Sequence, residues 1–592
     1  MTTKTLSLIA ASLLLSNTIY AEETLKDITV TTANKTAQSL QETTSNVTVI
    51  TAEDIQEHGY QTVAEAISHL PGITVTQNGG LGQPASLFVR GASAGRVLVL
   101  LDGMRLNDPS TTDGRATIAH LLTDNVERIE IVKGGASSIW GGNASAGVIN
   151  IITKNATKGL HVTSKIGYGS YDTKKAHLHA SYSDDAFSGV LNAAALKSDS
   201  FSALLPRDAE SDPYTNKSYN LKLGYAFDTN NKAKLSYNYI DYDVDYDSTF
   251  PTSNPDDTLS KSTGTQKNYK FDYLFSRDGM GLNLTASKGD FHREFPYGTY
   301  DVTLKEYTLL GTLAYDQGKA ILGLDYKDID DGSKGAYKNK AIYLSNTYHI
   351  NASTLIETNL RYDDFDKFAN KTTYKIGLKH HHDFLPGFTT GASYYTAYDA
   401  PSAYQIANPY NGASLKPAYT KGFEINANYK QYLTLSYFDN KVEDTLIYTG
   451  TYPNAGYING TGTEHFSGIE IGSTVGYGSF VLQGNYTHLF KYEDPNGNNL
   501  SKRAKDTLNV SLDHYTDNDT HVGIDAQYIG DREEFGQKTG NYTVWNFNVG
   551  TKVMKNLDVS IHAKNIFDKE YVTTAGYSTE GRSVYMDLKY SF

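Results

Sequence analysis

Few residues in the chain have the types and spacing that catalysis requires. The sequence contains no G-x-S-x-G nucleophile elbow, no H-E-x-x-H zinc motif and no Walker loop. The glycines of residues 79–82 are not followed by a helical pattern, so they predict a turn rather than a phosphate cradle. Three histidines cluster in residues 379–382, but side chains alternate along a strand, so at most His380 and His382 share a face. We therefore expect a solvated strand end there, no enzyme activity and no covalently bound cofactor.

The composition narrows the class of protein. A net charge of -13 argues against a nucleic-acid partner, because nucleic-acid surfaces cluster Lys and Arg. The absence of cysteine excludes a disulfide framework and a thiolate metal site. No internal apolar run reaches the roughly 18 residues that a membrane-spanning helix needs. The 46 tyrosines indicate another kind of membrane structure, because outer-membrane barrels carry aromatic girdles at both interfaces.

The N-terminal residues predict export. Residues 1–21 combine Lys4, an apolar run over Leu6–Leu15 and a small residue before two acidic ones, as in a cleaved secretory signal. Residues 22–44 form an N-terminal segment. A short β-prone stretch near a mature N-terminus can add a strand to the sheet edge of a partner. The stretch with this character here is Asp27, Ile28, Thr29, Val30, Thr31, Thr32 and Ala33.

Residues 45–155 predict a small α+β domain. Its end holds two β-branched runs, Val126–Val132 and Gly147–Thr153, joined by a glycine-rich crossing that permits close backbone approach. Upstream, Thr51 begins a sequence that resembles a helix capping box, with Asp in place of the usual Glu or Gln. Apolar residues at helical spacing predict a second helix over Thr62–Leu70.

Residues 156–592 predict a β-barrel. The stretch Val584–Phe592 alternates apolar and polar residues, so one face suits lipid and the other suits water. A soluble β-sandwich, the alternative, accounts less well for the tyrosines and for an apolar stripe that continues to a terminal aromatic residue. At about 20 residues per strand and connection, the region predicts about 22 strands, the number of plugged transporters. The predicted fold class is an all-β transmembrane barrel of antiparallel strands with an N-terminal α+β plug domain in its lumen.

The sequence VERIEIVKGG…IWGGNASAGVINIITK of residues 126–154 resembles the end of the plug domain of TonB-dependent outer-membrane receptors. Arg90-Gly91 is similar to another plug motif, and residues 565–571 resemble the last strands of that family. The resemblance implies a bacterial outer-membrane protein that actively imports a scarce, large ligand without a catalytic residue. It identifies residues 27–33 as a TonB box, and it implies TonB, outer-membrane lipid and a periplasmic binding protein as partners.

Among the branches of this family, the cobalamin receptors are the most similar. Residues 77–83 resemble their first plug loop, and residues 502–505 resemble a barrel segment with a ligand-contacting arginine. Carried over by position, the resemblance implies corrinoid contacts at Ser86, Ser93, Thr111, Thr112 and Arg503. Ser93 replaces an Asn and Pro84 replaces an apolar residue, so we expect a pocket of altered detail. Residues 402–414 contain no histidine, which argues against a haem receptor.

The same branch binds calcium through loop carboxylates, and calcium takes six to eight oxygen ligands. The matching residues are Asp199, Asp208, Glu210 and Asp212 in an early loop and Asp301 in a later one. A solvated acidic loop is the alternative. A second acidic stripe recurs at every other residue, and we expect it to form a solvated face in the lumen or at the rim; it consists of Asp241, Asp243, Asp245 and Asp247.

Three functions are compatible with these observations. The first is TonB-dependent import of cobalamin or another corrinoid. The second is import of a ferric siderophore by the same kind of receptor. The third is a passive channel or surface adhesin, which would not need residues 27–33.

Overall fold

The computed structural model describes residues 29–205, 210–247 and 259–592. The predicted export signal, Asp27 and Ile28 of the N-terminal stretch, and Asp208 of the acidic loop lie outside the described residues. Among the residues described, no helix has the length and apolar character needed to cross a membrane.

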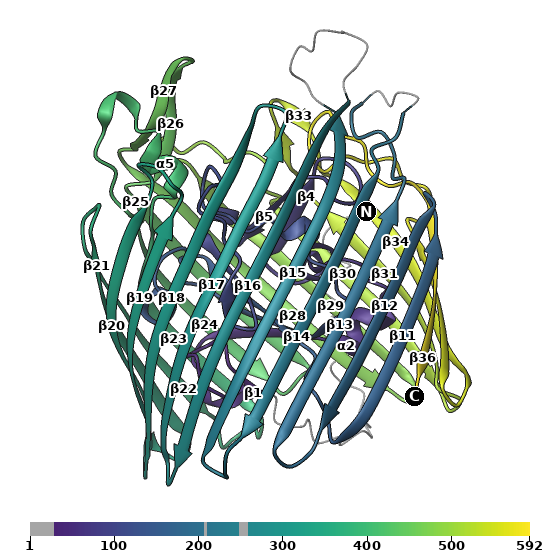
Figure 1. Ribbon diagram of the computed structural model, residues 1–592, viewed down its shortest axis with the longest axis horizontal. Helices are drawn as coiled ribbons and strands as arrows, with labels where there is room; N and C mark the ends of the chain where they lie inside the picture. The colour runs from purple at the N-terminus through teal and green to yellow at the C-terminus, as the bar shows by residue number, and fades with distance from the viewer. Residues whose placement is uncertain (1–28, 206–209, 248–258) are drawn as a thin grey trace.

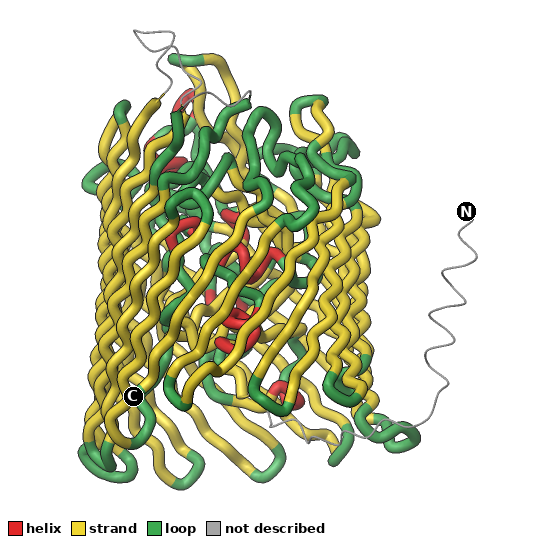
Figure 2. Tube along the Cα trace, turned by 90° about the vertical axis from the view of Figure 1, so that its right-hand side faces the viewer, coloured by secondary structure: helices red, strands yellow, loops and turns green. Residues whose placement is uncertain are grey.

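A closed barrel of 22 strands forms most of the molecule (Figures 1 and 2). Neighbouring strands pair antiparallel, and β11 pairs with β36 to close the wall, which confirms the predicted fold class and strand number. The strands are β11 (Gly159–Gly169), β12 (Thr173–Ser183), β13 (Phe187–Ser198), β14 (Tyr214–Ala226), β15 (Asn231–Asp247), β16 (Leu259–Arg277), β17 (Met280–Phe295), β18 (Gly298–Tyr315), β19 (Gly318–Asp330), β20 (Tyr337–Asn351), β21 (Thr354–Phe365), β22 (Lys371–His381), β23 (Phe388–Asp399), β24 (Ala418–Tyr429), β25 (Leu433–Glu443), β28 (Thr463–Tyr477), β29 (Phe480–Glu493), β30 (Asp506–Thr516), β31 (Thr520–Ile529), β34 (Tyr542–Met554), β35 (Leu557–Lys564) and β36 (Ser583–Ser591).

The alternation of side chains explains why these strands form a membrane wall. In β20, Ile342 and Leu344 are about half exposed on the outer face, whereas Tyr343 and Ser345 between them are buried towards the lumen. Outward apolar and inward polar or packed positions suit a strand with lipid on one side and a filled lumen on the other. The register of the wall is therefore fixed by which face each residue can tolerate.

The two ends of the barrel differ in the length of their connections. At one end, strands are joined by tight turns such as 278–279, 316–317 and 352–353. At the other end, long segments join them, including 400–417 and 565–582. A third long segment carries the hairpin β26 (Leu446–Thr451) and β27 (Asn454–Asn459), which stands above the rim at the top of Figure 1. Outer-membrane barrels have short periplasmic turns and longer extracellular loops, so the top of Figure 1 is the extracellular end.

The N-terminal domain fills the lumen and is called the plug below (purple in Figure 1). One sheet has the order β3-β9-β10-β7-β8, in which β10 pairs parallel with β7 and antiparallel with β9. A second sheet has the order β4-β5-β6. The elements are β3 (Asn46–Thr51), α2 (Ala52–Glu57), α3 (Val63–Ser68), β4 (Ile73–Gln77), β5 (Ala85–Val89), β6 (Ala92–Ser93), β7 (Val97–Leu101), β8 (Met104–Arg105), β9 (Val126–Lys133), α4 (Ser137–Trp140) and β10 (Gly147–Thr153).

Local signals in the plug sequence have their expected structural outcome. The Thr51 hydroxyl accepts a hydrogen bond from the Asp54 N–H, and the Asp54 carboxylate accepts one from the Thr51 N–H, so the capping box is present. The helix predicted over Thr62–Leu70 is shorter, because Thr62 caps it and α3 ends at Ser68. In the glycine-rich crossing, a Cβ at Gly135 would approach the Tyr395 ring to 2.4 Å. Glycine is therefore required where the plug meets the wall.

A buried charge cluster ties the plug to the barrel. Arg90 is 2% exposed and donates hydrogen bonds of 3.0 Å to both Glu424 and Glu470 on the wall. Lys133, at the end of β9, donates to the same Glu470 carboxylate at 2.8 Å. Buried charges persist only when they are paired and hydrogen-bonded, so this cluster fixes how the plug sits in the lumen.

Candidate ligand-binding and coupling sites

A cavity of about 460 Å³ opens above the plug at the extracellular end, and we call it the outer cavity. Its floor is the plug, through the loop around Gln83 and the segment Thr117–His120. Its side is the extracellular half of the wall strands β15, β16 and β17. The aromatic residues that line it are Tyr242, Tyr246, Phe295, Tyr297 and Tyr577.

A histidine in the floor of the outer cavity packs against two tyrosines of the wall. The His120 ring stacks on Tyr242 with centroids 3.5 Å apart, and its Nδ1 lies 3.1 Å from the Tyr214 hydroxyl. Burial lowers the pKa of His120 to about 3, so the imidazole is neutral at physiological pH. A neutral ring can pack face to face with tyrosine in an apolar setting at no charge-burial cost.

Cationic side chains stand beside the aromatic residues. The Arg293 guanidinium lies over the Phe295 ring at 5.7 Å and pairs with the Asp108 carboxylate of the plug at 2.8 Å. Arg115 pairs with Asp113 at 2.6 Å. The outer cavity therefore combines flat apolar surfaces with a few placed charges, as ligand sites commonly do.

The predicted contact residues divide into two groups. Ser86 and Thr111 both line the outer cavity, although they are distant in sequence. Ser93, Thr112 and Arg503 lie outside its lining. Arg503 instead donates a 2.9 Å hydrogen bond from Nε to the Gly91 carbonyl and lies over the Phe88 ring, and burial lowers its pKa to about 10.

The aromatic wall of the outer cavity was not predicted from the sequence. Tyr242 and Val244 alternate with the acidic stripe, whose regular carboxylates are the more conspicuous pattern in this strand. Asp241, Asp243 and Asp245 lie on the opposite face of β15, near the rim and not in the lumen. The available signal was an apolar inward face at the extracellular end of a strand, where a water-filled lumen would call for polar residues.

Two of the described carboxylates predicted for calcium have hydrogen-bond partners within the protein. Asp212 is buried and accepts a 2.7 Å hydrogen bond from the Ala203 N–H. Asp301 lies in β18 rather than in a loop, and it pairs with His292 at 2.7 Å. Of the residues that the structure describes, no three His, Asp or Glu side chains are spaced to hold a metal ion. Calcium binding by Asp199, Asp208, Glu210, Asp212 and Asp301 stays a prediction.

The described part of the N-terminal stretch is held inside the barrel. Thr29–Val30 forms β1, which pairs with β2 (Gln38–Ser39). The backbone N–H groups of Thr31 and Thr32 each donate a 2.9 Å hydrogen bond to the buried Glu130 carboxylate on β9. The Trp140 indole donates to the Thr32 carbonyl at 2.8 Å. Main-chain groups that a partner strand would need are thus already engaged.

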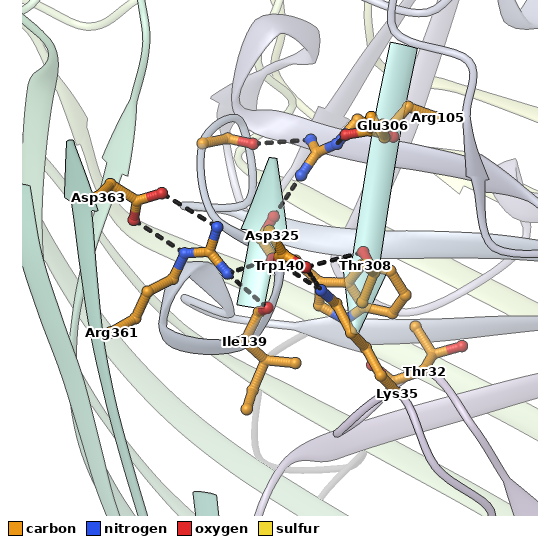
Figure 3. Close-up of polar contacts among 11 residues, drawn as sticks. Thr32, Lys35, Arg105, Ile139, Trp140, Glu306, Thr308, Asp325, Arg361 and Asp363 are labelled. Carbon is orange, nitrogen blue, oxygen red and sulfur yellow. Dashed lines mark hydrogen bonds and ion pairs between the residues drawn. The ribbon is translucent and has the colours of Figure 1, made fainter. Parts of the chain in front are cut away.

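A polar cluster follows directly after this stretch (Figure 3). The Lys35 ammonium pairs with Asp325 on the wall at 3.1 Å, and Arg361 donates to the same carboxylate at 2.6 Å. Arg361 also makes a two-point contact with Asp363 at 2.8 and 3.0 Å. Burial lowers the pKa of Lys35, although Asp325 opposes the shift. One carboxylate of the wall therefore connects the N-terminal segment to the barrel.

The cluster borders a second cavity, of about 370 Å³, which we call the inner cavity. It lies between the plug and the wall, where it reaches the periplasmic half of β15, β16 and β17 and also strands β14 and β18 to β21. Eight of its lining residues are cationic, namely Lys35, Arg105, Arg128, Lys222, Lys234, Lys270, Lys327 and Arg361. Four are anionic, namely Asp102, Asp272, Glu306 and Asp325.

Comparisons with known proteins agree with this architecture. Residues 39–148 match the family model of the TonB-dependent receptor plug domain, and residues 161–566 match the model of the TonB-dependent receptor-like β-barrel. The chain is 30% identical, over 98% of its length and 97% of the relative's, to a protein named vitamin B12 transporter BtuB from Vibrio cholerae serotype O1.

Solved structures share the fold at lower identity. The siderophore receptor PirA from Acinetobacter baumannii has a TM-score of 0.80 and 18% identity, with 92% of this chain and 98% of that chain covered. A mutant ferric enterobactin receptor PfeA from Pseudomonas aeruginosa has a TM-score of 0.79 and 19% identity, with the same coverage. The chain therefore belongs to the TonB-dependent receptors, a family of outer-membrane barrels closed by a plug that transport rather than catalyse.

Proposed function

We propose that this receptor imports cobalamin or another corrinoid across the outer membrane. The observation that carries the proposal is the outer cavity, which the plug and the wall build together at the extracellular end. Its aromatic side chains suit a flat macrocycle, and the hydroxyls of Ser86 and Thr111 suit the amide arms around it. The relatives named vitamin B12 transporter, similar over nearly the whole chain, support this choice.

Ser93, Thr112 and Arg503 complete the proposed contact surface. Ser93 is half-buried at the end of β6, and Thr112 is exposed beside Thr111. Arg503 donates a hydrogen bond to the carbonyl of Gly91, which lies two residues before Ser93 in the sequence. We expect these residues to reach a ligand larger than the outer cavity, whose upper part would extend towards the loops.

Import requires an input of energy, because the plug fills the lumen of the barrel through which the ligand must pass. We propose that TonB pairs with Asp27–Ala33 by strand addition and pulls on the plug from the periplasm. The ligand would then pass to a periplasmic binding protein. The hydrogen bonds from Thr31 and Thr32 to Glu130 would be the first contacts to resist that pull.

A ferric siderophore is the second candidate ligand. Many ferric chelates are anionic, and Arg115, Arg293 and Lys502 place positive charge around the outer cavity. The solved structures with the same fold include receptors named for siderophores, although their identity to this chain supports the fold alone.

Titration of the purified full-length receptor separates the two ligands. We expect saturable calorimetric binding of cyanocobalamin and none of ferric enterobactin. Ser86→Tyr should block binding by filling the outer cavity, whereas Ser276→Tyr, at an exposed position near the periplasmic turns, should not. Tight binding of the ferric chelate without the corrinoid would reject the first candidate. Uptake that survives deletion of residues 27–33 would reject TonB-driven import in favour of a passive channel.

A further inference from the structure

The inner cavity carries more positive charge than its neighbours neutralise. Most of its cations have a carboxylate partner. Lys35 and Arg361 share Asp325, Arg105 pairs with Glu306 at 2.8 Å, Lys222 with Asp102 at 3.1 Å, Lys270 with Asp272 at 3.0 Å and Arg128 with Glu130 at 2.8 Å. Lys234 and Lys327 have no carboxylate within 4.0 Å among the residues that the structure describes.

Lys327 is the more informative of the two lysines. It lies on the inward face of β19, is 7% exposed, and lines the inner cavity. Its surroundings contain Arg105 and Arg361, whose charges repel an ammonium group, and Glu306 and Asp363, which are already paired with those arginines. Burying a charged lysine without a counter-ion is costly, so Lys327 is suited to bind an anion.

We propose that the inner cavity binds an oxyanion of the phosphate class at Lys327. The unmatched Lys327 ammonium attracts a phosphate ion, which carries between one and two negative charges at neutral pH. Lysine binds phosphate as a point charge, and the exposed Lys234 elsewhere in the cavity lining adds to the positive field. The cavity volume suits a small ion or one arm of a larger ligand rather than an entire corrinoid.

The oxyanion has two sources. It can be free inorganic phosphate, or it can be the phosphodiester of a corrinoid nucleotide arm that passes through the lumen. The second source rests on the proposed function, whereas the first does not. The two are separable, because cobinamide is a corrinoid that lacks the nucleotide arm and its phosphodiester.

The first test is calorimetry of the full-length receptor in detergent with sodium phosphate at low ionic strength, with sodium chloride as the reference salt. Lys327→Met should weaken phosphate binding at least tenfold. Lys340→Met removes the same charge from an exposed, outward position on β20 and should leave the affinity within twofold of wild type. Because Lys327 forms no ion pair, its replacement leaves no buried carboxylate unpaired and should not lower the unfolding temperature.

Two results would overturn the site: no saturable phosphate binding by the wild-type receptor, or equal affinity of wild type and Lys327→Met. Uptake assays then identify the source. If Lys327→Met slows uptake of cyanocobalamin but not of dicyanocobinamide, the anion is the ligand's phosphodiester. If phosphate binding is lost and neither uptake changes, the anion is free phosphate. Failure of the wild type to take up either corrinoid would reject the proposed function and leave the calorimetric test intact.

Discussion

The outer and inner cavities share strands β15, β16 and β17 and have opposite chemistry. On β15, the inward residues near the extracellular end are Tyr242 and Val244, whereas those near the periplasmic end are Lys234 and Ser236. Strand β17 also has an aromatic residue at its extracellular end, where Phe295 lines the outer cavity. The lumen is thus apolar and aromatic where a ligand arrives, and rich in cationic side chains deeper between the plug and the wall.

This difference suggests how capture and release can share one route. Aromatic faces gain free energy from a flat ligand by removing apolar surface from water. A charged and polar lining such as that of the inner cavity offers no such gain, so a ligand displaced from above meets no second apolar site there. A continuous aromatic lining would bind at every level and would slow release.

The largest expected effect comes from breaking the buried charge cluster that ties the plug to the wall. Arg90→Met leaves Glu424 and Glu470 buried with one fewer cation, which should cost about 3–5 kcal/mol of stability. We expect a lower unfolding temperature in detergent and measurable ion conductance in planar bilayers. Arg277→Gln, which breaks an exposed turn pair with Asp278, should change stability by about 0–1 kcal/mol. Equal unfolding of Arg90→Met and wild type would show that the cluster does not hold the plug.

The next effect concerns the segment that borders the inner cavity. Glu130→Gln replaces the acceptor of Thr31 and Thr32, and hydrogen bonds to a charged group contribute about 1.5–3 kcal/mol. The chain has no cysteine, so a spin label at Thr29→Cys reports on this segment alone. Its mobility should rise with Glu130→Gln and stay unchanged with Glu127→Gln, on the same strand. An immobile label in both variants would contradict the role of Glu130.

A smaller effect should show that each cavity binds its own ligand, cyanocobalamin in the outer cavity and phosphate in the inner cavity. Tyr242→Ala removes a ring that lines the outer cavity and stacks on His120, and loss of such a contact commonly costs a factor of about ten in affinity. We expect weaker cyanocobalamin binding and unchanged phosphate binding by calorimetry. Lys327→Met should have the opposite profile. If either variant weakens both ligands equally, the two cavities are not independent sites.

At neutral pH the smallest effect is that of His120 in the floor of the outer cavity, because its contribution to the pH dependence of stability appears only on acidification. His120 has a pKa of about 3 when folded and an ordinary value near 6.5 when unfolded, so below pH 6.5 the unfolded chain takes up the proton first. Stability should therefore fall by up to about 1.4 kcal/mol per pH unit from pH 6.5 towards 3. His120→Phe should make the decline of unfolding free energy between pH 7 and 4 shallower, whereas the exposed His161→Phe should not. Parallel curves would rule out His120 as the cause.

Sequence patterns predicted the scaffold better than the cavities. The alternation in Val584–Phe592 and the β-branched runs of β9 and β10 report local requirements, since each residue need only suit its own face. The resemblance located Ser86 and Thr111 for a similar reason, because they lie in plug loops with recognisable motifs. The fold class and strand number followed from these local signals.

The inner cavity could not be predicted in the same way. Lys35, Asp325 and Arg361 are brought together only when the barrel closes around the plug, and no local pattern encodes that closure. Lys327 looks like any inward polar residue of a barrel strand until its lack of a partner is seen. The acidic loop shows the converse, since carboxylates such as Asp212 and Asp301 that a resemblance groups together have separate partners in the structure.

Strand β9 has a mechanical consequence. Its Glu130 receives Thr31 and Thr32, and Lys133 on the same strand is bound to Glu470 of the wall. Tension applied to the N-terminal segment would therefore reach the wall along β9, in parallel with the direct pair between Lys35 and Asp325. The Glu470 carboxylate, which also holds Arg90, is the point where that load meets the rigid cylinder. How hard the periplasmic partner must pull would then depend in part on one acidic side chain embedded in the wall.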